Sequence, residues 1–94
     1  MAARVVVPSA LRRFSDGNAH VDVDGRTLRE VLDALAAQYP GVTARVLDEQ
    51  GDLRRHVNVF VDGEESRVLG GLATPTGPNA EVVILPAVSG GAGA

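Results

Sequence analysis

The residues of this chain with the clearest chemical potential are two glycines near its carboxyl end, Gly90 and Gly91. Glycine has no side chain, so this backbone can enter a passage that is too narrow for other residues. A glycine pair that ends a chain is therefore typical of a handle gripped by an enzyme, with the carboxylate of Gly91 as the reactive group. Here Ala92-Gly93-Ala94 follow, so Gly91 gains a free carboxylate only if these three residues are removed.

The side chains offer few alternatives to this backbone chemistry. Cysteine is absent, which excludes disulfides, thiolate zinc sites and thiol nucleophiles. His20 and His56 have no neighbours at a spacing that completes a zinc site, and the serines lack the sequence context of a nucleophile elbow. The carboxylates of Asp22 and Asp24 are expected on a solvated face as ordinary surface charges. We therefore predict no catalytic and no metal-binding side chains.

Composition limits the domain count and the class of partner. Ninety-four residues predict one small domain, and 45% apolar with only 3% aromatic content predicts a modest core of Val, Leu, Ile and Ala. The net charge is −3 and the basic residues form no cluster larger than a pair, which disfavours nucleic acid as a partner. No apolar run approaches the ~20 residues that span a bilayer, and the amino end lacks a signal-peptide core. We expect a cytoplasmic protein with no membrane partner.

The glycine pair follows directly on a predicted strand. Residues 4–8 and 81–85 are short apolar runs, typical of strands that are buried on both faces and central in a sheet. Residues 20–24 alternate between polar and apolar side chains, as a half-buried strand does. The polar, turn-rich residues 12–18 connect the first two strands.

One long helix is predicted after these two strands. Thr27 and Glu30 have the spacing of a capping box, in which each side chain accepts a hydrogen bond from an exposed backbone N–H. Apolar residues then recur at helical spacing and form a single stripe, made up of Leu28, Val31, Leu32, Leu35, Ala36 and Tyr39. Pro40 and Gly41 end the helix.

The second half of the chain is predicted to return to the sheet. Residues 42–47 suit one short helical turn, and residues 56–61 form a strand. Asp62-Gly63 is a strong signal for a two-residue hairpin turn, so residues 65–69 would be the returning edge strand. Residues 70–79 form an irregular loop, in which a second glycine pair serves backbone geometry.

The resulting order is β-β-α-β-β-β, with the first and last strands side by side. Such a pair must run parallel, and the intervening helix allows the crossover. The sequence therefore predicts an α+β fold, the ubiquitin-like β-grasp, with a mixed sheet of about five strands and one long helix across one face. Residues 1–88 would form this domain, and residues 89–94 a flexible glycine-rich tail.

The alternation within the strands also predicts an uncovered apolar patch. If the valines of residues 57–61 meet the helix, then Phe60 lies on the opposite face of the sheet. The same alternation sends Leu85 to that face, and Pro86 follows it. An exposed patch of Phe60, Leu85 and Pro86 beside the tail would be a docking surface for a partner. Alternatively, residues 42–50 or 70–79 fold over the patch and bury it.

Taken together, these segments resemble a known family, the small sulfur carriers of the ubiquitin-like superfamily. That family includes the small subunit of molybdopterin synthase and the thiamine sulfur carrier. The resemblance covers nearly the whole chain and rests on Arg4–Pro8, Thr27–Leu32, His56–Gly63, Gly70–Thr74 and Ile84–Gly91. Within the family, residues 56–74 and the ending Leu-Pro-Ala-Val-Ser-Gly-Gly are most similar to the actinobacterial carriers of cysteine biosynthesis.

The resemblance implies a protein that is a substrate rather than an enzyme and that binds no cofactor itself. An E1-like adenylating enzyme would recognise Val88, Ser89 and Gly90 and would use ATP to join the Gly91 carboxylate to AMP. Sulfur would then replace AMP and leave a C-terminal thiocarboxylate. For the cysteine route, a pyridoxal-phosphate-dependent cysteine synthase would accept the sulfur, and a metalloprotease of the deubiquitinase type would release cysteine.

The residues after Gly91 depart from the family pattern. A processing protease would have to remove them, unless the chain is an inactive relative or Ala94 is itself the functional end. Thiamine, molybdopterin and thiosugar routes would use the same handle as the cysteine route. Two other functions stay open: a modifier that is conjugated to lysines of other proteins, and a β-grasp interaction module without C-terminal chemistry.

Overall fold

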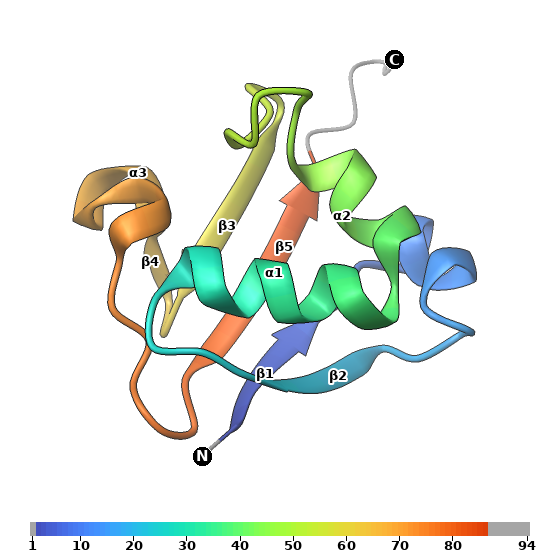
Figure 1. Cartoon of the computed structure of the whole chain (residues 1–94), viewed down its shortest axis with the longest axis horizontal. Helices are drawn as coiled ribbons and strands as arrows, with labels where there is room; N and C mark the ends of the chain where they lie inside the picture. Colours follow the sequence, from blue (N-terminus) through green and yellow to red (C-terminus); the bar gives the residue numbers. More distant parts are fainter. Residues whose placement is uncertain (1, 87–94) are drawn as a thin grey trace.

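The structure is a computed structural model, and it describes residues 2–86. A five-stranded sheet is covered on one face by helices (Figure 1). The strands are β1 (Ala2–Val6), β2 (His20–Asp24), β3 (Val57–Val61), β4 (Glu64–Glu65) and β5 (Glu81–Pro86). The helices are η1 (Ser9–Phe14), α1 (Leu28–Gln38), α2 (Pro40–Val46), α3 (Ser66–Leu69) and η2 (Gly71–Ala73).

The sheet has the order β2-β1-β5-β3-β4, with β5 in the centre. β1 and β5 run parallel, while the β1–β2, β3–β5 and β3–β4 pairs are antiparallel. The first and last strands of the chain are therefore neighbours, as the β-grasp prediction requires. This mixed sheet with helices on one side confirms the predicted fold class.

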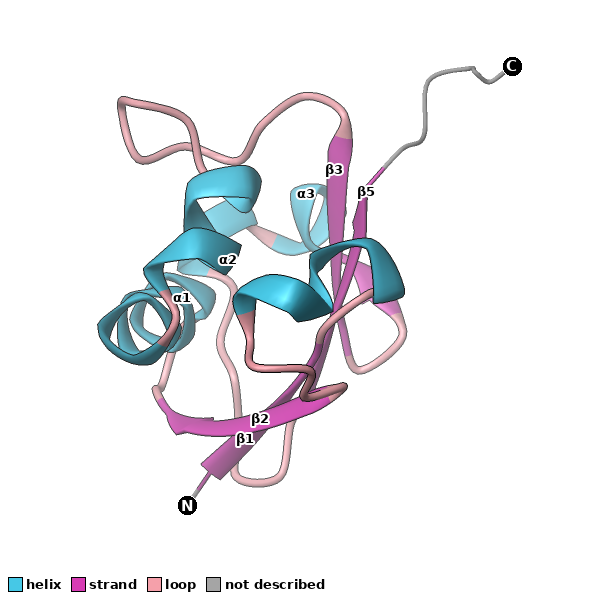
Figure 2. Ribbon diagram, turned by 90° about the vertical axis from the view of Figure 1, so that its right-hand side faces the viewer, coloured by secondary structure: helices cyan, strands magenta, loops and turns pink. Residues whose placement is uncertain are grey.

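Each long strand buries one face only. In β1 and β5 the buried residues alternate with exposed or half-buried ones, so that Val5, Val82 and Ile84 are fully buried while Arg4 and Leu85 are exposed. The prediction that both strands are central is confirmed, but the prediction that they are buried on both faces is wrong. The helices cover a single face of the sheet, so even its interior strands keep an open side (Figure 2).

The long helix α1 begins as predicted. The Thr27 hydroxyl accepts a hydrogen bond from the Glu30 N–H at 3.2 Å, while the Glu30 carboxylate accepts one from the Arg26 N–H at 2.9 Å rather than from that of Thr27. Four residues of the predicted stripe are fully buried, namely Leu28, Val31, Leu32 and Leu35. The stripe therefore carries the core, and the cap satisfies N–H groups that a helix start leaves without partners.

The loop before β5 fastens the start of α1. The carbonyl of Thr74 accepts a hydrogen bond from the Leu28 N–H at 2.9 Å, and the hydroxyl of Thr76 donates to the carbonyl of Gly25 at 2.9 Å. Both threonines are buried. The loop that looks irregular in sequence thus has a defined task, because it joins α1 to the strand that ends the described chain.

Two short helices complete the layer above the sheet. The predicted single turn after α1 is a helix of seven residues, α2, which Pro40 begins at a position that suits proline. The connection after β1 contains a 3-10 helix, η1, whose Phe14 ring lies between the guanidinium groups of Arg13 and Arg45 at 4.8 and 3.7 Å. Nearby, the Asn18 amide donates a hydrogen bond to the Tyr39 hydroxyl at 3.2 Å.

The predicted edge strand at residues 65–69 is wrong. The hairpin itself forms, with Asp62 and Gly63 at the positive φ angles of 51° and 86° that its turn demands. However, β4 stops after two residues, and the chain closes a helical turn in which the Ser66 carbonyl accepts the Gly70 N–H at 2.9 Å. Local strand propensity does not decide such a short segment, in which Ser66 is fully buried.

Among residues 2–86, none of the helices has the length and apolar character needed to cross a membrane.

Gly25 is the position where the fold tolerates a side chain least. A Cβ atom at Gly25 would lie 2.6 Å from the Val31 nitrogen and 2.8 Å from its Cγ2. We expect Gly25→Ala to lower the free energy of unfolding by about 2 kcal/mol, because the first turn of α1 must shift. Urea denaturation measures this loss. Gly77→Ala is the control, since a Cβ there meets nothing within 4 Å; equal stability of the two variants would contradict the packing argument.

Candidate functional site

The residues predicted to carry the chemistry lie outside the described part of the chain. Val88, Ser89, Gly90 and Gly91 all come after Pro86, the last residue that the structure describes. The predicted boundary between residues 1–88 and the tail at 89–94 falls there as well. The structure therefore describes the strand from which these residues continue and the surface beside that strand.

The strand that leads to the glycines is held on both sides. β5 pairs with β1 from Glu81 to Val83 and with β3 from Val82 to Pro86. At its start, the Asp62 side chain accepts a hydrogen bond from the Glu81 N–H, and the Asp62 N–H donates to the Glu81 carbonyl, both at 2.9 Å. Val82 and Val83 thus have partners on both sides, while Pro86 is held through its pairing with Val57 of β3.

The outer face of the sheet carries an apolar row beside this end. Val6 on β1, Val83 on β5 and Phe60 on β3 are register partners across three neighbouring strands. All three are half-buried and lie outside the core cluster. Leu85, one step further along β5, is 47% exposed. We call these four residues the outer apolar row; it contains Phe60 and Leu85, which the alternation of the sequence places on this face.

The third residue predicted for docking is placed differently. Pro86 is the register partner of Val57, which is buried in the core, so by the alternation of the strand it belongs to the helix side of the sheet. The structure therefore brings Phe60 and Leu85 together on the outer face and sets Pro86 on the helix side at the strand end, so the prediction that Pro86 belongs to the same patch is wrong.

The alternative in which another segment covers the outer face is wrong. Leu47 and Leu72, from the two segments considered as covers, pack against the core cluster on the helix side. Figure 2 shows α1 and α2 together on one side of the sheet. Among the described residues, the outer apolar row is therefore open to a partner.

An arginine that sequence reasoning missed closes one end of this face. Arg67 on α3 donates hydrogen bonds to the Asn58 side chain at 2.9 Å, to the Arg54 carbonyl at 2.7 Å and to Glu65 at 3.4 Å. This planar fork joins α3 to the start of β3 and to β4. The signal in the sequence was weak, because Arg67 stands in a segment that reads as an edge strand.

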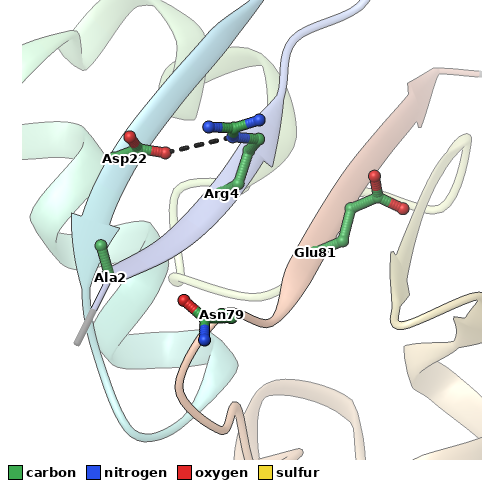
Figure 3. Close-up of a pocket in the computed structure, with 5 residues that line it drawn as sticks. All are labelled: Ala2, Arg4, Asp22, Asn79 and Glu81. Atoms are coloured by element: carbon green, nitrogen blue, oxygen red, sulfur yellow. Dashed lines mark hydrogen bonds and ion pairs between the residues drawn. The ribbon is translucent and has the colours of Figure 1, made fainter.

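A small hollow lies at the other end of the outer face, near the start of β1. It has a volume of about 360 Å³ and is lined by Ala2, Arg4, Asp22, Asn79 and Glu81 (Figure 3). Arg4 points toward Asp22, with 3.3 Å between the Arg4 Nε and a carboxylate oxygen, and both side chains are more than half exposed. Such an exposed ion pair contributes little stability, and the hollow adds a charged rim to the apolar row.

The described residues hold no arrangement that suggests catalysis. Both histidines are exposed, and residues 2–86 contain no group of three His, Cys, Asp or Glu side chains able to hold a metal ion. Ser15 is buried, and its hydroxyl is within hydrogen-bond distance of two backbone carbonyls, those of Arg12 and Asn18. The geometry is that of a rigid domain with a docking face and a fixed strand end.

Comparison with known proteins identifies the family. The model of the ThiS family matches residues 5–91. The chain is 41% identical over 93 residues to the sulfur carrier protein CysO of Mycobacterium tuberculosis, covering 97% of this chain and all of that protein. The chain belongs to the ThiS family of ubiquitin-like sulfur carriers. Proteins of this family carry sulfur and are substrates of other enzymes, so this protein is a sulfur carrier rather than an enzyme.

Solved structures agree with this membership. The chain matches CysO of Amycolatopsis orientalis, solved as a BexX/CysO complex, with a TM-score of 0.89 and 35% identity over 95% of this chain and 99% of that one. It is also 42% identical over 72 residues to small archaeal modifier protein 1 of Haloferax volcanii, which covers 76% of this chain and 78% of that protein. The family fold thus serves proteins named as carriers and proteins named as modifiers.

The Arg67 fork makes a stability prediction. Arg67→Lys keeps the charge but cannot reproduce a planar group that reaches three acceptors. We expect a loss of about 1 kcal/mol in the free energy of unfolding, discounted because the side chain is 37% exposed. Urea denaturation measures it, with Arg55→Lys at an exposed position as the control. A stability equal to that of the control would show that the fork is dispensable.

Proposed function

We propose that this sulfur carrier is activated at Gly91, once Ala92-Gly93-Ala94 have been removed, and that it delivers sulfur as a C-terminal thiocarboxylate for cysteine biosynthesis. An E1-like adenylating and sulfur-transferring enzyme performs the activation with ATP. A biosynthetic enzyme, of the pyridoxal-phosphate-dependent cysteine synthase type, accepts the sulfur. The processing protease, the activating enzyme and the acceptor are the three partners of the cycle, which takes place in the cytoplasm.

The observation that carries this proposal is the fixed end of β5. Five residues separate Pro86 from Gly91, and a segment of that length extends at most about 18 Å. Pro86 pairs with Val57 of β3, which gives this segment a firm base, so the Gly91 carbonyl can enter an active site while the domain stays outside. The glycine pair suits such an entry because it has no side chains.

The chemistry needs nothing from the side chains of the carrier. A carboxylate oxygen of Gly91 attacks the α-phosphate of ATP, and pyrophosphate leaves. Sulfide, or the outer sulfur of a persulfide on the activating system, then attacks the carbonyl carbon, and AMP leaves with the oxygen that came from the carboxylate. Sulfide gives the thiocarboxylate on Gly91 directly, whereas a persulfide gives an acyl disulfide that a thiol reduces to the thiocarboxylate, the thiol ending in a disulfide with the donor. The absence of cysteine suits this series of reactions, because the carrier has no thiol that could compete for the activated carbonyl.

Removal of the last three residues is supported by the extent of the family match. The match ends at Gly91, so Ala92, Gly93 and Ala94 lie beyond the conserved length of the family model. Small residues of this kind are easily cleaved.

Mass spectrometry tests this cycle directly. We expect the chain that ends at Gly91 to gain the mass difference between sulfur and oxygen when it is incubated with its activating enzyme, ATP and a sulfur donor. The full-length chain should stay unchanged, because its terminal carboxylate belongs to Ala94. Gly91→Ala in the shortened chain is the control for tail recognition. Sulfur gained by the full-length chain and not by the shortened one would overturn the choice of Gly91.

We further propose that the activating enzyme docks on the outer apolar row. Phe60 and Leu85 lie on the open face of the sheet beside the strand end that leads to Gly91. A partner that covers this row would also sit next to Pro86, so docking and entry of the tail occur together. Burial of apolar surface that is exposed in the free carrier provides free energy of association.

Phe60→Glu tests the docking face. We expect it to weaken binding of the activating enzyme at least tenfold, because a charge must then be buried in the interface. Val68→Glu is the matched control: Val68 on α3 is 82% exposed and is not a member of the row. Isothermal titration measures the affinities, and circular dichroism checks that both variants fold. Equal affinity of the two variants would exclude the row as the docking surface.

A second candidate function is conjugation to lysines of other proteins. It is favoured by the 42% identity to small archaeal modifier protein 1, since the same activated Gly91 would be joined to an amine in place of sulfur. Immunoblotting of the native cell separates the two outcomes, because a modifier produces high-mass conjugates that a pure carrier does not. A β-grasp module without tail chemistry would keep its full function after deletion of residues 90–94.

A further inference from the structure

The basic residues of this chain are all of one kind. It contains nine arginines and no lysine, and cysteine is absent as well. Amines and thiols are the side chains that capture an activated acyl group, because they combine a lone pair with a pKa near enough to neutrality. The guanidinium of arginine stays protonated and delocalises its charge, so it offers no such lone pair. None of the nine arginine side chains is therefore an efficient acceptor for an acyl group.

The position of the arginines gives this composition a structural meaning. Arg54 and Arg55 are separated by one residue, His56, from β3, whose first residue, Val57, is the register partner of Pro86. Arg12 donates from its Nε to the carbonyl of Val7, at 3.0 Å, where β1 ends beside β5. These side chains lie close to the point from which the chain continues toward Gly91. If they were lysines, they would be the first amines that an activated Gly91 meets.

Structural need for a guanidinium explains only part of the pattern. Arg67 and Arg54 use their planar groups to reach backbone carbonyls, which lysine would do less well. In contrast, Arg26, Arg29 and Arg55 are exposed positions, where a lysine would fit equally well and where surface charge alone does not select arginine.

We propose that the lysine-free, cysteine-free surface keeps the activated carrier inert toward itself. This inference rests on the proposed activation at Gly91. In a chain with an amine near β5, the amine nitrogen would attack the Gly91 carbonyl, AMP or a thiol would leave, and the nitrogen would lose a proton to give an isopeptide. Here that step has no side-chain amine or thiol as partner, so the acyl group is lost to water or to a nucleophile on another molecule. For the same reason, a copy of this protein that is conjugated to another protein has no lysine to which a second copy could be joined. Such conjugates therefore carry single copies rather than chains.

Two matched variants place an amine within and beyond the reach of Gly91. Arg55→Lys lies next to the strand end, within the ~18 Å that five residues span. Arg26→Lys lies near the opposite end of the sheet, where the Asn79 N–H donates to the Ala2 carbonyl. Seven residues of β5 and its approach separate that level from Pro86, a distance of about 23 Å. Both variants keep the charge and differ in where the amine stands.

The test uses chemical activation, so that it does not depend on the enzyme. The full-length chain and the chain that ends at Gly91 are each prepared as C-terminal thioesters and incubated at neutral pH. We expect the wild type to lose its thioester by hydrolysis alone, while Arg55→Lys in the chain ending at Gly91 forms an internal isopeptide. At about 10 μM protein, this closure should be on the order of 100-fold faster than self-linkage of Arg26→Lys, since short linkers give effective concentrations near millimolar. Added free lysine should be acylated by every thioester, which shows that each one is reactive.

Peptide mapping by mass spectrometry decides the outcome. The proposal would be overturned if the wild-type chain linked to itself as fast as the Arg55→Lys variant does, through any of its own nitrogen or oxygen atoms. So would an Arg55→Lys thioester that decays only by hydrolysis, because arginine would then protect nothing. A wild type that is inert as a thioester but gains no sulfur from the activating enzyme would support the inert surface while contradicting the proposed activation at Gly91.

Discussion

The whole architecture depends on β5 being paired on both sides while one of its faces is buried. Val82 and Ile84 have no exposed surface and share the core with Leu32 and Leu35 of α1. Each such side chain contributes roughly 1.5–3 kcal/mol through burial, and the backbone of β5 pairs with β1 from Glu81 to Val83 and with β3 from Val82 to Pro86. A strand with these constraints cannot slip by one residue, because a slip would turn its apolar side chains away from the core. The end of the described chain therefore has a fixed place.

The two faces of the sheet divide the work of the domain. The face under α1 and α2 is filled with aliphatic side chains and holds the fold together. The other face has the outer apolar row in its middle, Arg67 with its acceptors at one side and the hollow around Arg4 at another. Because the helices occupy one side only, the surface for recognition is made by the same strands that build the core. Docking and stability are thus linked through the alternation of β3 and β5.

Most of the fold follows from local patterns in the sequence, and the exceptions have physical causes. The α1 stripe, the Asp62-Gly63 turn and the alternation that exposes Phe60 are all short-range signals that determine their own structure. The helical turn at Ser66 could not be predicted from strand periodicity, because the Ser66 carbonyl accepts hydrogen bonds from the Gly70 N–H and from the Thr74 hydroxyl of the following loop. The Arg67 fork needs the same long-range contacts. The residues expected to carry the chemistry, Gly90 and Gly91, were identified by composition and resemblance, and the structure describes the strand that leads to them.

The contact between Asn18 and Tyr39 gives the molecule an optical label at a defined place. Tyr39 is the single tyrosine, and the chain has no tryptophan, so its near-ultraviolet emission comes almost wholly from one phenol. That phenol lies where the end of α1 meets the turn between β1 and β2. It belongs to the helical layer, so the sheet separates it from the outer apolar row. A change in tyrosine fluorescence during an encounter at the open face would therefore report a rearrangement transmitted through the sheet, whereas constant emission would indicate a rigid body.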